Sequence, residues 1–314
     1  MFPEFYNRKL KKNYTIHPDK STTDDIPVEI NHIPRFVTSD SYASLFGHQW
    51  KKFKKTQLDS YTGTTISADR LNRCLGNLKN DLKNKLVLEA GCGAGRFTEI
   101  LLQKGATLVS SDISSAVEAN IENFPLSDNH LVIQADINAM PYQDEVFDVV
   151  ICLGVIQHTP DPDTSIANLY KLVKKGGYLI IDHYTFNRSY LFRTAPLYRY
   201  YLKKKSAKQT LQITQHLVKK YLPLHKKFAK NKFMTMLVNR ISPVISYYSA
   251  LPQLNDKLQE EWALLDTHDS LTDWFKHFRN KKQIAGILKK LGAVNIWCEY
   301  GGNGVEARCQ KPLN

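Results

Sequence analysis

Short apolar runs alternate with amphipathic stretches through the middle of the chain. Residues 86–88 form one such run, of the kind that parallel sheets bury. Three glycines follow this run, at Gly91, Gly93 and Gly95. Apolar positions then recur at helical spacing from Phe97, and Gly105 stands where that helix would end. The pattern predicts a strand, a glycine turn and a helix, with a turn that lets backbone approach a ligand.

The same alternation continues on both sides of a long interruption. Further strands are expected at residues 107–111, 131–135, 147–154, 178–182, 294–300 and 305–310. Helices are expected at residues 114–123, 163–173 and 281–291, with residues 174–177 as the basic end and glycine stop of the second. The last two strands predict a closing hairpin whose final strand is antiparallel. The chain is therefore expected to belong to the α/β class.

Two segments depart from this alternation. Residues 186–265 contain no expected strand, and four prolines are expected to divide them into short helices: Pro196, Pro223, Pro243 and Pro252. We interpret this segment as an inserted helical lid. Before the first strand lie an extended stretch at residues 26–35 and an aromatic stretch from Tyr42. The predicted organisation is an N-terminal cap at 1–80, a core at 81–185 and 277–314, and a basic lid at 186–276.

The glycine spacing separates three kinds of nucleotide-binding turn. A dinucleotide fingerprint needs a third glycine where this chain has Arg96, and a P-loop needs a Gly-Lys-Ser/Thr sequence that is absent. What remains is Glu-x-Gly-x-Gly-x-Gly, beginning at Glu89 and continuing through Gly91, Gly93 and Gly95. This motif resembles the first motif of the class I S-adenosylmethionine-dependent methyltransferases. The resemblance implies a Rossmann-like seven-stranded sheet with an antiparallel last strand, and S-adenosyl-L-methionine as cofactor.

Acidic residues end the second and third expected strands. Asp112 lies 21 residues beyond Gly91, where a carboxylate suits the ribose hydroxyls of an adenosine. Its alternative role is an N-cap for the helix that begins near Ser114. The resemblance implies that Asp136 binds the adenine amino group and that its neighbour packs on the ring. It extends the expected cofactor site to Ile113, Ile137 and Leu153.

Group-specific phrases occur at both ends of the chain. Phe-Gly-x-Gln-Trp and Thr-Gln-Leu-Asp-Ser-x-Thr-Gly resemble the leader of a bacterial methyltransferase group whose acceptors are mostly unassigned. Asp-Ser-Leu-Thr-Asp-Trp-Phe-Lys-His-Phe and the later Gly-Gly-Asn-Gly-Val-Glu-Ala-Arg resemble the same group. We expect Trp50, Gln57, Asp59 and Asn303 to lie near the cofactor or acceptor. The alternative is a small helical cap that only packs on the core.

Methyl transfer is an in-line displacement that needs alignment and a dry site but no covalent nucleophile. If the acceptor is a hydroxyl, a general base assists, and O-methylation is the favoured reaction. His158, on the loop after the fourth strand, is the candidate base, against the alternative of a structural loop histidine. His268 is the rival candidate, beside Asp269. No cluster has metal-ligand spacing.

The charge of the chain is concentrated in the lid. The net charge is +13, and 14 Lys or Arg residues with no Asp or Glu lie between His183 and Asn255. Such a segment suits a solvated face, an anionic membrane or lipid-linked acceptor, or RNA. No separate RNA-binding module is recognisable. We therefore favour a small-molecule, sugar or lipid-linked acceptor over tRNA or rRNA, with the contact to membrane or RNA placed at residues 188–232. The remaining functional class is a module that binds the cofactor but does not catalyse methyl transfer.

Composition indicates a globular protein in a reducing compartment. Hydrophobic residues make up 42% of the chain, and five cysteines include no C-x-x-C pair. The first residues lack a basic region followed by an apolar core, and the run at 149–156 is too short to span a bilayer. The expected location is cytoplasmic, with peripheral contact to the membrane as an option.

Overall fold

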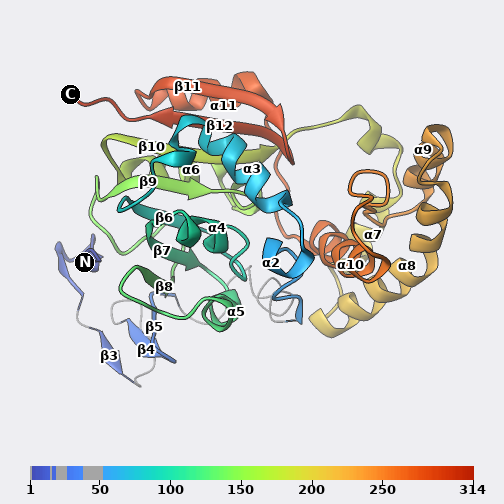
Figure 1. Cartoon of the computed structure of the whole chain (residues 1–314), viewed down its shortest axis with the longest axis horizontal. Coiled ribbons are helices and arrows are strands. Elements are labelled where there is room, and N and C mark those ends of the chain that lie inside the picture. Colours follow the sequence, from blue (N-terminus) through green and yellow to red (C-terminus); the bar gives the residue numbers. More distant parts are fainter. Residues whose placement is uncertain (1, 15, 19–26, 38–51) are drawn as a thin grey trace. The chain divides into compact units, whose positions relative to one another are not determined.

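The computed structural model describes residues 2–14, 16–18, 27–37 and 52–314, and the chain divides into two compact units (Figure 1). The first unit comprises Met1–Lys54, Thr64–Phe186 and Phe275–Asn314. The second comprises Lys55–Gly63 and Asn187–Trp274. The second unit thus contains most of the segment predicted as the lid, together with a short piece from the predicted cap.

The first unit is built on one mixed sheet. The predicted strands form β6 (Leu86–Ala90), β7 (Thr107–Asp112), β8 (His130–Gln134), β9 (Phe147–Cys152), β10 (Val173–Tyr184), β11 (Val294–Gly301) and β12 (Gly304–Gln310). They lie in the order β11-β12-β10-β9-β6-β7-β8. The strands from β10 to β8 in this order are parallel, and β12 is antiparallel to both β10 and β11. The predicted methyltransferase sheet with an antiparallel last strand is therefore confirmed.

Helices cover both faces of this sheet because residues along its central strands are apolar on both sides. One face packs against α3 (Ile66–Leu75), which continues into a 3-10 turn η1 (Gly76–Asn80), and against α4 (Thr98–Gln103). The other packs against α6 (Pro162–Leu172) and α11 (Lys281–Lys290). Within β9, Val149 and Ile151 face the first layer, whereas Val150 faces the second. The helix α5 (Ala116–Asn123) packs through Val117 on β8.

Three short N-terminal strands lengthen the sheet at the β8 edge. They are β5 (Ile33–Arg35), β4 (Val28–Ile30) and β3 (His17–Pro18). Strands β4 and β5 form a hairpin whose two turn residues, Asn31 and His32, both have positive φ. This is the backbone of a type I′ turn, which matches the twist of a hairpin. The stretch expected only to be extended thus covers what would be an exposed strand edge. A further two-stranded ribbon joins β1 (Tyr6–Asn7) and β2 (Lys12–Asn13).

The prediction that residues 174–177 end a helix is wrong. Helix α6 ends at Leu172, and β10 begins at Val173 with an irregular register between Val173 and Tyr178. Gly176 has a φ of 75°, and its N–H donates to the Lys311 carbonyl oxygen. Lys174 pairs with Asp148 at 3.0 Å. The glycines therefore shape a bulge at the start of a strand, where they were expected to stop a helix.

The second unit is helical. It contains α2 (Asp59–Thr62), a 3-10 turn η3 (Arg188–Phe192), α7 (Ala195–Leu202), α8 (Ala207–Phe228), α9 (Lys232–Ile241) and α10 (Asp256–Thr272). Pro196 lies in the first turn of α7, as expected for proline. Pro223 lies inside α8 and does not divide it, so that prediction is wrong. Pro223 has no N–H to donate within the helix. The buried side chains of Leu217, Val218 and Leu222, in the turns just before it, pack α8 against the rest of the second unit and offset this lost hydrogen bond.

A buried polar network joins β6, α4 and β7 beneath the glycine turn. The Glu89 carboxylate accepts hydrogen bonds from Thr98 Oγ1 at 2.5 Å and from Ser110 Oγ at 3.2 Å. Asn120 Nδ2 donates to Thr98 Oγ1 at 3.0 Å, and His130 Nε2 lies 3.2 Å from Ser110 Oγ. Burial raises the pKa of Glu89 to about 7, although the two hydroxyl donors act in the opposite direction.

Glu89→Gln should remove a pH dependence from the stability of the protein. An unfolded glutamate ionises near pH ~4.3, whereas the folded carboxyl of Glu89 has a pKa of about 7. The folded state therefore holds this proton more tightly, and its stabilising contribution of about 4 kcal/mol is lost as the pH rises from about 4.3 to 7. Urea unfolding at steps of pH should show the free energy of unfolding of the variant rising relative to wild type across this range.

Glu260→Gln is the matched control, because Glu260 is exposed on α10. The free energy of unfolding of Glu260→Gln should not rise relative to wild type between pH ~4.3 and ~7. Parallel stability curves for wild type and Glu89→Gln would contradict the buried-carboxyl interpretation.

Candidate functional site

The glycine turn after β6 brings backbone close to two neighbouring segments. Gly91 has a φ of 82° and Gly95 a φ of 103°, which favour glycine. A Cβ at Gly91 would lie 2.2 Å from Val155 Cγ2, and one at Gly95 would lie 2.6 Å from the Phe124 ring. Both positions therefore exclude a side chain. Gly93 also has positive φ, at 52°.

Asp112, at the end of β7, braces this turn. Its Oδ2 accepts a hydrogen bond from the Gly93 N–H at 3.0 Å. Its Oδ1 accepts from the N–H and hydroxyl of Ser114 at 2.8 and 2.7 Å. The alternative role of Asp112 as the N-cap of the next helix is wrong, because α5 begins at Ala116 with Ser115 at its N-cap position. Asp112 instead closes a turn onto Ser114. Oδ2 keeps further acceptor capacity, since a carboxylate oxygen takes two donors. Burial raises the pKa of Asp112, opposed by the hydrogen bonds from Ser114 and Gly93.

The next strand ends place Asp136, Ile137 and Leu153 at the same edge of the sheet. Asp136 Oδ1 accepts from the Asn138 N–H at 2.8 Å, and no described residue donates to its Oδ2. Ile137 and Leu153 are buried, at 5% and 6% exposure. Ile113 follows Asp112, and its carbonyl oxygen accepts from Gln134 Nε2 at 3.0 Å. The carboxyl ends of parallel strands are where α/β sheets bind their ligands.

Gly154, which follows β9, combines positive φ with open space. Its φ is 82°, and among the described residues no heavy atom other than those of its chain neighbours lies within 4 Å of where a Cβ would be. Its N–H donates to Asp182 Oδ1 at 2.6 Å. The other oxygen of Asp182 accepts a hydrogen bond from the Arg70 guanidinium, and both side chains are buried. The pair therefore fixes the backbone at the exit of β9.

Sequence reasoning missed the role of this pair. Asp182 ends the fifth expected strand, as Asp112 and Asp136 end earlier ones, and this signal could have found it. Arg70 carries no such signal, because nothing in its helix pattern distinguishes a buried arginine from an exposed one.

Glu89 lies beneath the turn and not in open space. It is 3% exposed, and its carboxylate is bound by Thr98 and Ser110. These contacts support a role in holding the turn, so direct contact with a cofactor stays a prediction.

His158 lies in η2 (Ile156–His158), the 3-10 turn after β9. Its Nδ1 lies 3.2 Å from the Phe275 carbonyl oxygen, and its ring meets the Tyr184 ring edge to face at 5.3 Å. An Nδ1–H that donates to this carbonyl leaves the lone pair on Nε2. Neighbouring Gln157 is fully buried, and neither end of its amide has a partner among the described residues.

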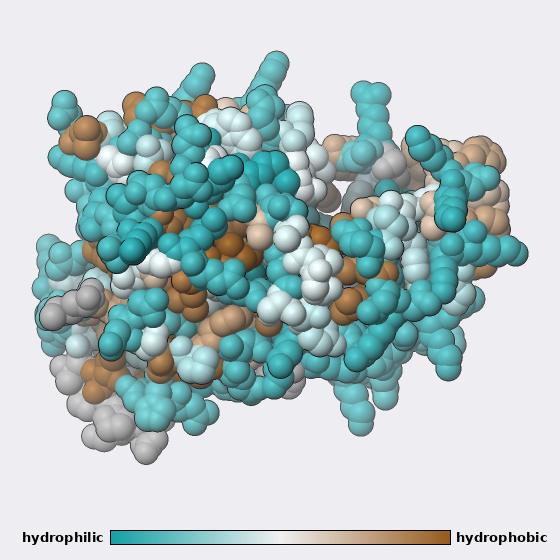
Figure 2. Space-filling view, in the orientation of Figure 1, coloured by the Kyte–Doolittle hydropathy of each residue, from teal (hydrophilic) through white to brown (hydrophobic). Residues whose placement is uncertain are grey.

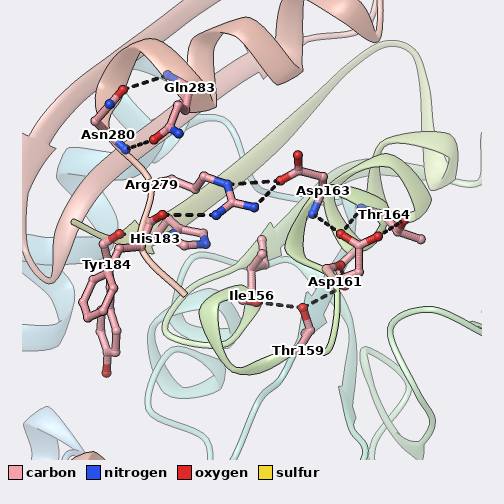
Figure 3. Close-up of polar contacts among 12 residues, drawn as sticks. Ile156, Thr159, Asp161, Asp163, Thr164, His183, Tyr184, Arg279, Asn280 and Gln283 are labelled. Carbon is pink, nitrogen blue, oxygen red and sulfur yellow. Dashed lines mark hydrogen bonds and ion pairs between the residues drawn. The ribbon is translucent and has the colours of Figure 1, made fainter. Parts of the chain in front are cut away.

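The segment that re-enters the core lies beside the exit of β10. The Arg279 N–H donates to the Tyr184 carbonyl oxygen at 2.9 Å, and the His277 N–H donates to the Gln157 carbonyl oxygen at 3.0 Å. The Arg279 guanidinium contacts Asp163, in the first turn of α6, at 3.1 Å (Figure 3). Buried His183 lies beside this segment in Figure 3, and burial lowers its pKa. The His277 contact therefore joins the re-entering segment to η2, and the Arg279 contacts join it to β10 and α6.

Other predicted residues lie in the second unit or outside the described chain. His268 is buried in α10, with Nε2 at 3.4 Å from Thr210 Oγ1 of α8. Gln57 donates to Asp266 at 3.2 Å, and Asp59 begins α2. Asn303 is exposed in the turn between β11 and β12. Trp50 lies outside the described residues.

The strand-end residues of the first unit fit an adenosine-bearing cofactor. Asp112 and Asp136 supply carboxylate acceptors, the turn from Gly91 to Gly95 supplies close backbone approach, and Gly154 borders open space. Acceptors of this kind suit ribose hydroxyls and an adenine amino group. The described residues contain no group of His, Cys, Asp or Glu placed to hold a metal ion. In this part of the chain, no helix has the length and apolar character to span a bilayer.

Comparison with known proteins places the site in a family. Residues 88–181 match the family model described as a methyltransferase domain. The ubiquinone biosynthesis O-methyltransferase of Pseudomonas fluorescens is 36% identical over 118 residues, which are 36% of this chain and 50% of that protein. Its counterpart in Pseudomonas entomophila is 36% identical over 111 residues, covering 34% and 47%. The chain thus spans about half the length of the curated relatives it matches.

Solved structures match more of the chain at lower identity. Magnesium protoporphyrin IX methyltransferase of Synechocystis is 16% identical, with 85% of this chain and 94% of that chain covered and a TM-score of 0.43. The family assignment depends on the sequence matches and not on this likeness. Over residues 88–181, this chain carries a class I S-adenosylmethionine-dependent methyltransferase domain.

Proposed function

We propose that the protein transfers a methyl group from S-adenosylmethionine to a hydroxyl of a small-molecule, sugar or lipid-linked acceptor. The observation that carries the proposal is the meeting of the glycine turn with Asp112, Asp136 and Gly154 at one edge of the sheet. The O-methyltransferase names of the relatives support oxygen as the accepting atom.

The cofactor would be held by residues of the first unit. S-adenosylmethionine supplies a methyl group on a sulfonium cation, which a nucleophile displaces in line. Asp112 would bind the ribose hydroxyls and Asp136 the adenine amino group, with Ile113, Ile137 and Leu153 as the apolar surroundings. Asp182 would keep the Gly154 backbone clear of the cofactor, through the hydrogen bond at 2.6 Å to its N–H. Buried walls of this kind exclude water from the reacting atoms.

His158 is the proposed general base. With Nδ1–H held by the Phe275 carbonyl oxygen, Nε2 is the atom that takes the hydroxyl proton. The Tyr184 ring fixes the plane of the imidazole. His268 is the weaker candidate, because its Nε2 faces Thr210 in the packed interior of the second unit.

The basic helical segment supports an anionic partner, and RNA is the second candidate acceptor. Fourteen Lys or Arg residues without an acid between His183 and Asn255 suit a phosphate-bearing or membrane-associated acceptor, and also a tRNA or rRNA.

Labelled cofactor and fractionated cell extract would separate these acceptors. Methyl-labelled S-adenosylmethionine should place label in a lipid or small-molecule fraction if the proposal holds. Label in RNA would favour the second candidate. Cofactor binding without transfer to any fraction would favour a binding module that lacks activity.

Asp112→Ala should weaken S-adenosylmethionine binding by about 1.5–3 kcal/mol, the range for lost hydrogen bonds to a charged group. Titration calorimetry measures the loss. Asp128→Ala is the matched control, since Asp128 is exposed in the loop before β8. Equal affinity of the Asp112 and Asp128 variants would remove Asp112 from the cofactor site.

His158→Ala should slow methyl transfer by a factor of about 10²–10⁴, the usual contribution of a general base, with cofactor affinity unchanged. The pH–rate profile should also lose the limb that reports the histidine. His158→Asn is the informative companion, because its amide can still donate to the Phe275 carbonyl oxygen but cannot act as a base. If His158→Asn restores turnover, His158 is a structural residue of the loop.

A further inference from the structure

The outer surface of the second unit exposes large apolar side chains on η3, α7 and α9. Phe192 is 69% exposed, Leu197 73% and Tyr200 70%. On α9, Phe233 is 64% exposed and Ile241 57%, and Met236 is exposed as well. Val238 is the one buried residue of α9, whereas Met234 and Leu237 are half-buried, so half of the apolar residues of this helix are exposed. Figure 2 shows hydrophobic residues gathered over α9 among hydrophilic side chains.

Hydrogen bonds bring these elements together. The Thr194 N–H donates to the Arg240 carbonyl oxygen at 3.0 Å, and the Thr194 hydroxyl donates to the Ile241 carbonyl oxygen at 3.0 Å. The start of α7 therefore lies against the end of α9. Phe192 and Leu197 flank Thr194 in sequence. We call the exposed side chains of Phe192, Leu197, Tyr200, Phe233, Met236 and Ile241 the docking face.

Cations accompany the docking face. Lys204 Nζ lies 4.5 Å from the centre of the Tyr200 ring, and Lys205 Nζ lies 4.8 Å from that of Tyr201. Neither lysine forms an ion pair among the described residues. Arg193 and Arg240 are also exposed. Aromatic rings beneath ammonium groups place apolar contact and positive charge on one surface.

The acids of the second unit lie on α2 and on or directly after α10, and the elements of the docking face contain none. Buried Asp273 pairs with Arg199 at 2.6 Å, and exposed Asp256 pairs with Lys226 at 2.6 Å. Asp266 accepts hydrogen bonds from Gln57 and Tyr247. Because no acid lies between His183 and Asn255, the segments that carry the docking face have no carboxylate of their own to offset its positive charge.

We propose that the docking face binds an anionic lipid bilayer, lying in its interface without crossing it. This inference rests on the proposed function, which gives the basic segment an anionic partner, and it identifies that partner as a lipid bilayer. Aliphatic side chains such as Leu197, Met236 and Ile241 offer no ring on which a base could stack, whereas they gain free energy on entering a lipid interface. Basic residues beside them gain from an anionic headgroup layer. The aliphatic side chains favour lipid over RNA, whereas the basic residues suit either anionic partner.

Vesicle flotation tests the inference. At low salt the full chain should float with phosphatidylcholine vesicles that contain about 30 mol% phosphatidylglycerol, and it should not float with vesicles of phosphatidylcholine alone. Binding should weaken as salt rises, because exposed charges are screened beyond about 8–10 Å near physiological ionic strength.

Two variants separate the apolar and charged contributions. Lys204→Glu with Lys205→Glu should weaken binding by about 25-fold or more, since each basic residue near an anionic surface contributes about fivefold. Leu197→Ser with Ile241→Ser should weaken it by about tenfold or more, through lost apolar burial. Lys203 is left unchanged because its ammonium donates to the Trp274 carbonyl oxygen at 2.7 Å. Circular dichroism and S-adenosylmethionine calorimetry should match wild type in both variants.

Lys289→Glu with Lys290→Glu is the matched control. It changes the net charge equally at exposed positions of α11, outside the docking face. The control should float like wild type. Equal loss in the control and the docking-face variant, or retention of tRNA on filters without flotation, would overturn the inference. Methyl transfer to a soluble acceptor by a protein that fails to float would overturn it and leave the proposed function intact.

Discussion

The exit of β9 depends on one buried carboxylate. Asp182 accepts the Gly154 N–H on one oxygen and the Arg70 guanidinium on the other. It therefore joins the end of β10, the loop after β9 and helix α3, which are distant in sequence. A buried carboxylate that lost its guanidinium would carry an uncompensated charge, so these three elements are held as a set. This set holds the Gly154 backbone in a left-handed conformation, and no described residue beyond its chain neighbours fills the space beside it.

The central part of the fold could be predicted because local pattern and global arrangement agree there. Each buried strand is an apolar run, and a parallel sheet needs its strands buried on both faces. The glycines at 91 and 95 could be identified because close approach excludes a Cβ, and the structure supplies the neighbours, Val155 and Phe124. The antiparallel β12 followed from a tight turn between two strands.

The features that sequence reasoning missed depend on contacts distant in sequence. The pairing of β5 with β8 cannot be read from Ile33–Arg35 alone, because an extended segment with a proline suits many loops. Pro223 was expected to end a helix, but tertiary packing of Leu217 and Leu222 outweighs its local preference. Arg70 reads as an ordinary helical arginine until Asp182 is placed opposite it. In the candidate site, the positions of Asp112 and Asp136 could be predicted from the sequence. The hydrogen bonds of Thr98 and Ser110 to Glu89 could not.

The chain leaves the first unit after β10 and returns to it at the same place. The Phe186 and Phe278 rings meet at 5.8 Å, and the Arg279 N–H is bonded to the Tyr184 carbonyl oxygen. An insertion whose two ends adjoin can be gained, lost or exchanged without disturbing the strand order of its host. The stretch Asn187–Trp274 is thus modular: a short linker between β10 and α11 would close the sheet without it, and only Lys55–Gly63 would lose its partners in the second unit. Chains that share the sheet can therefore differ in this stretch while the strand order stays the same.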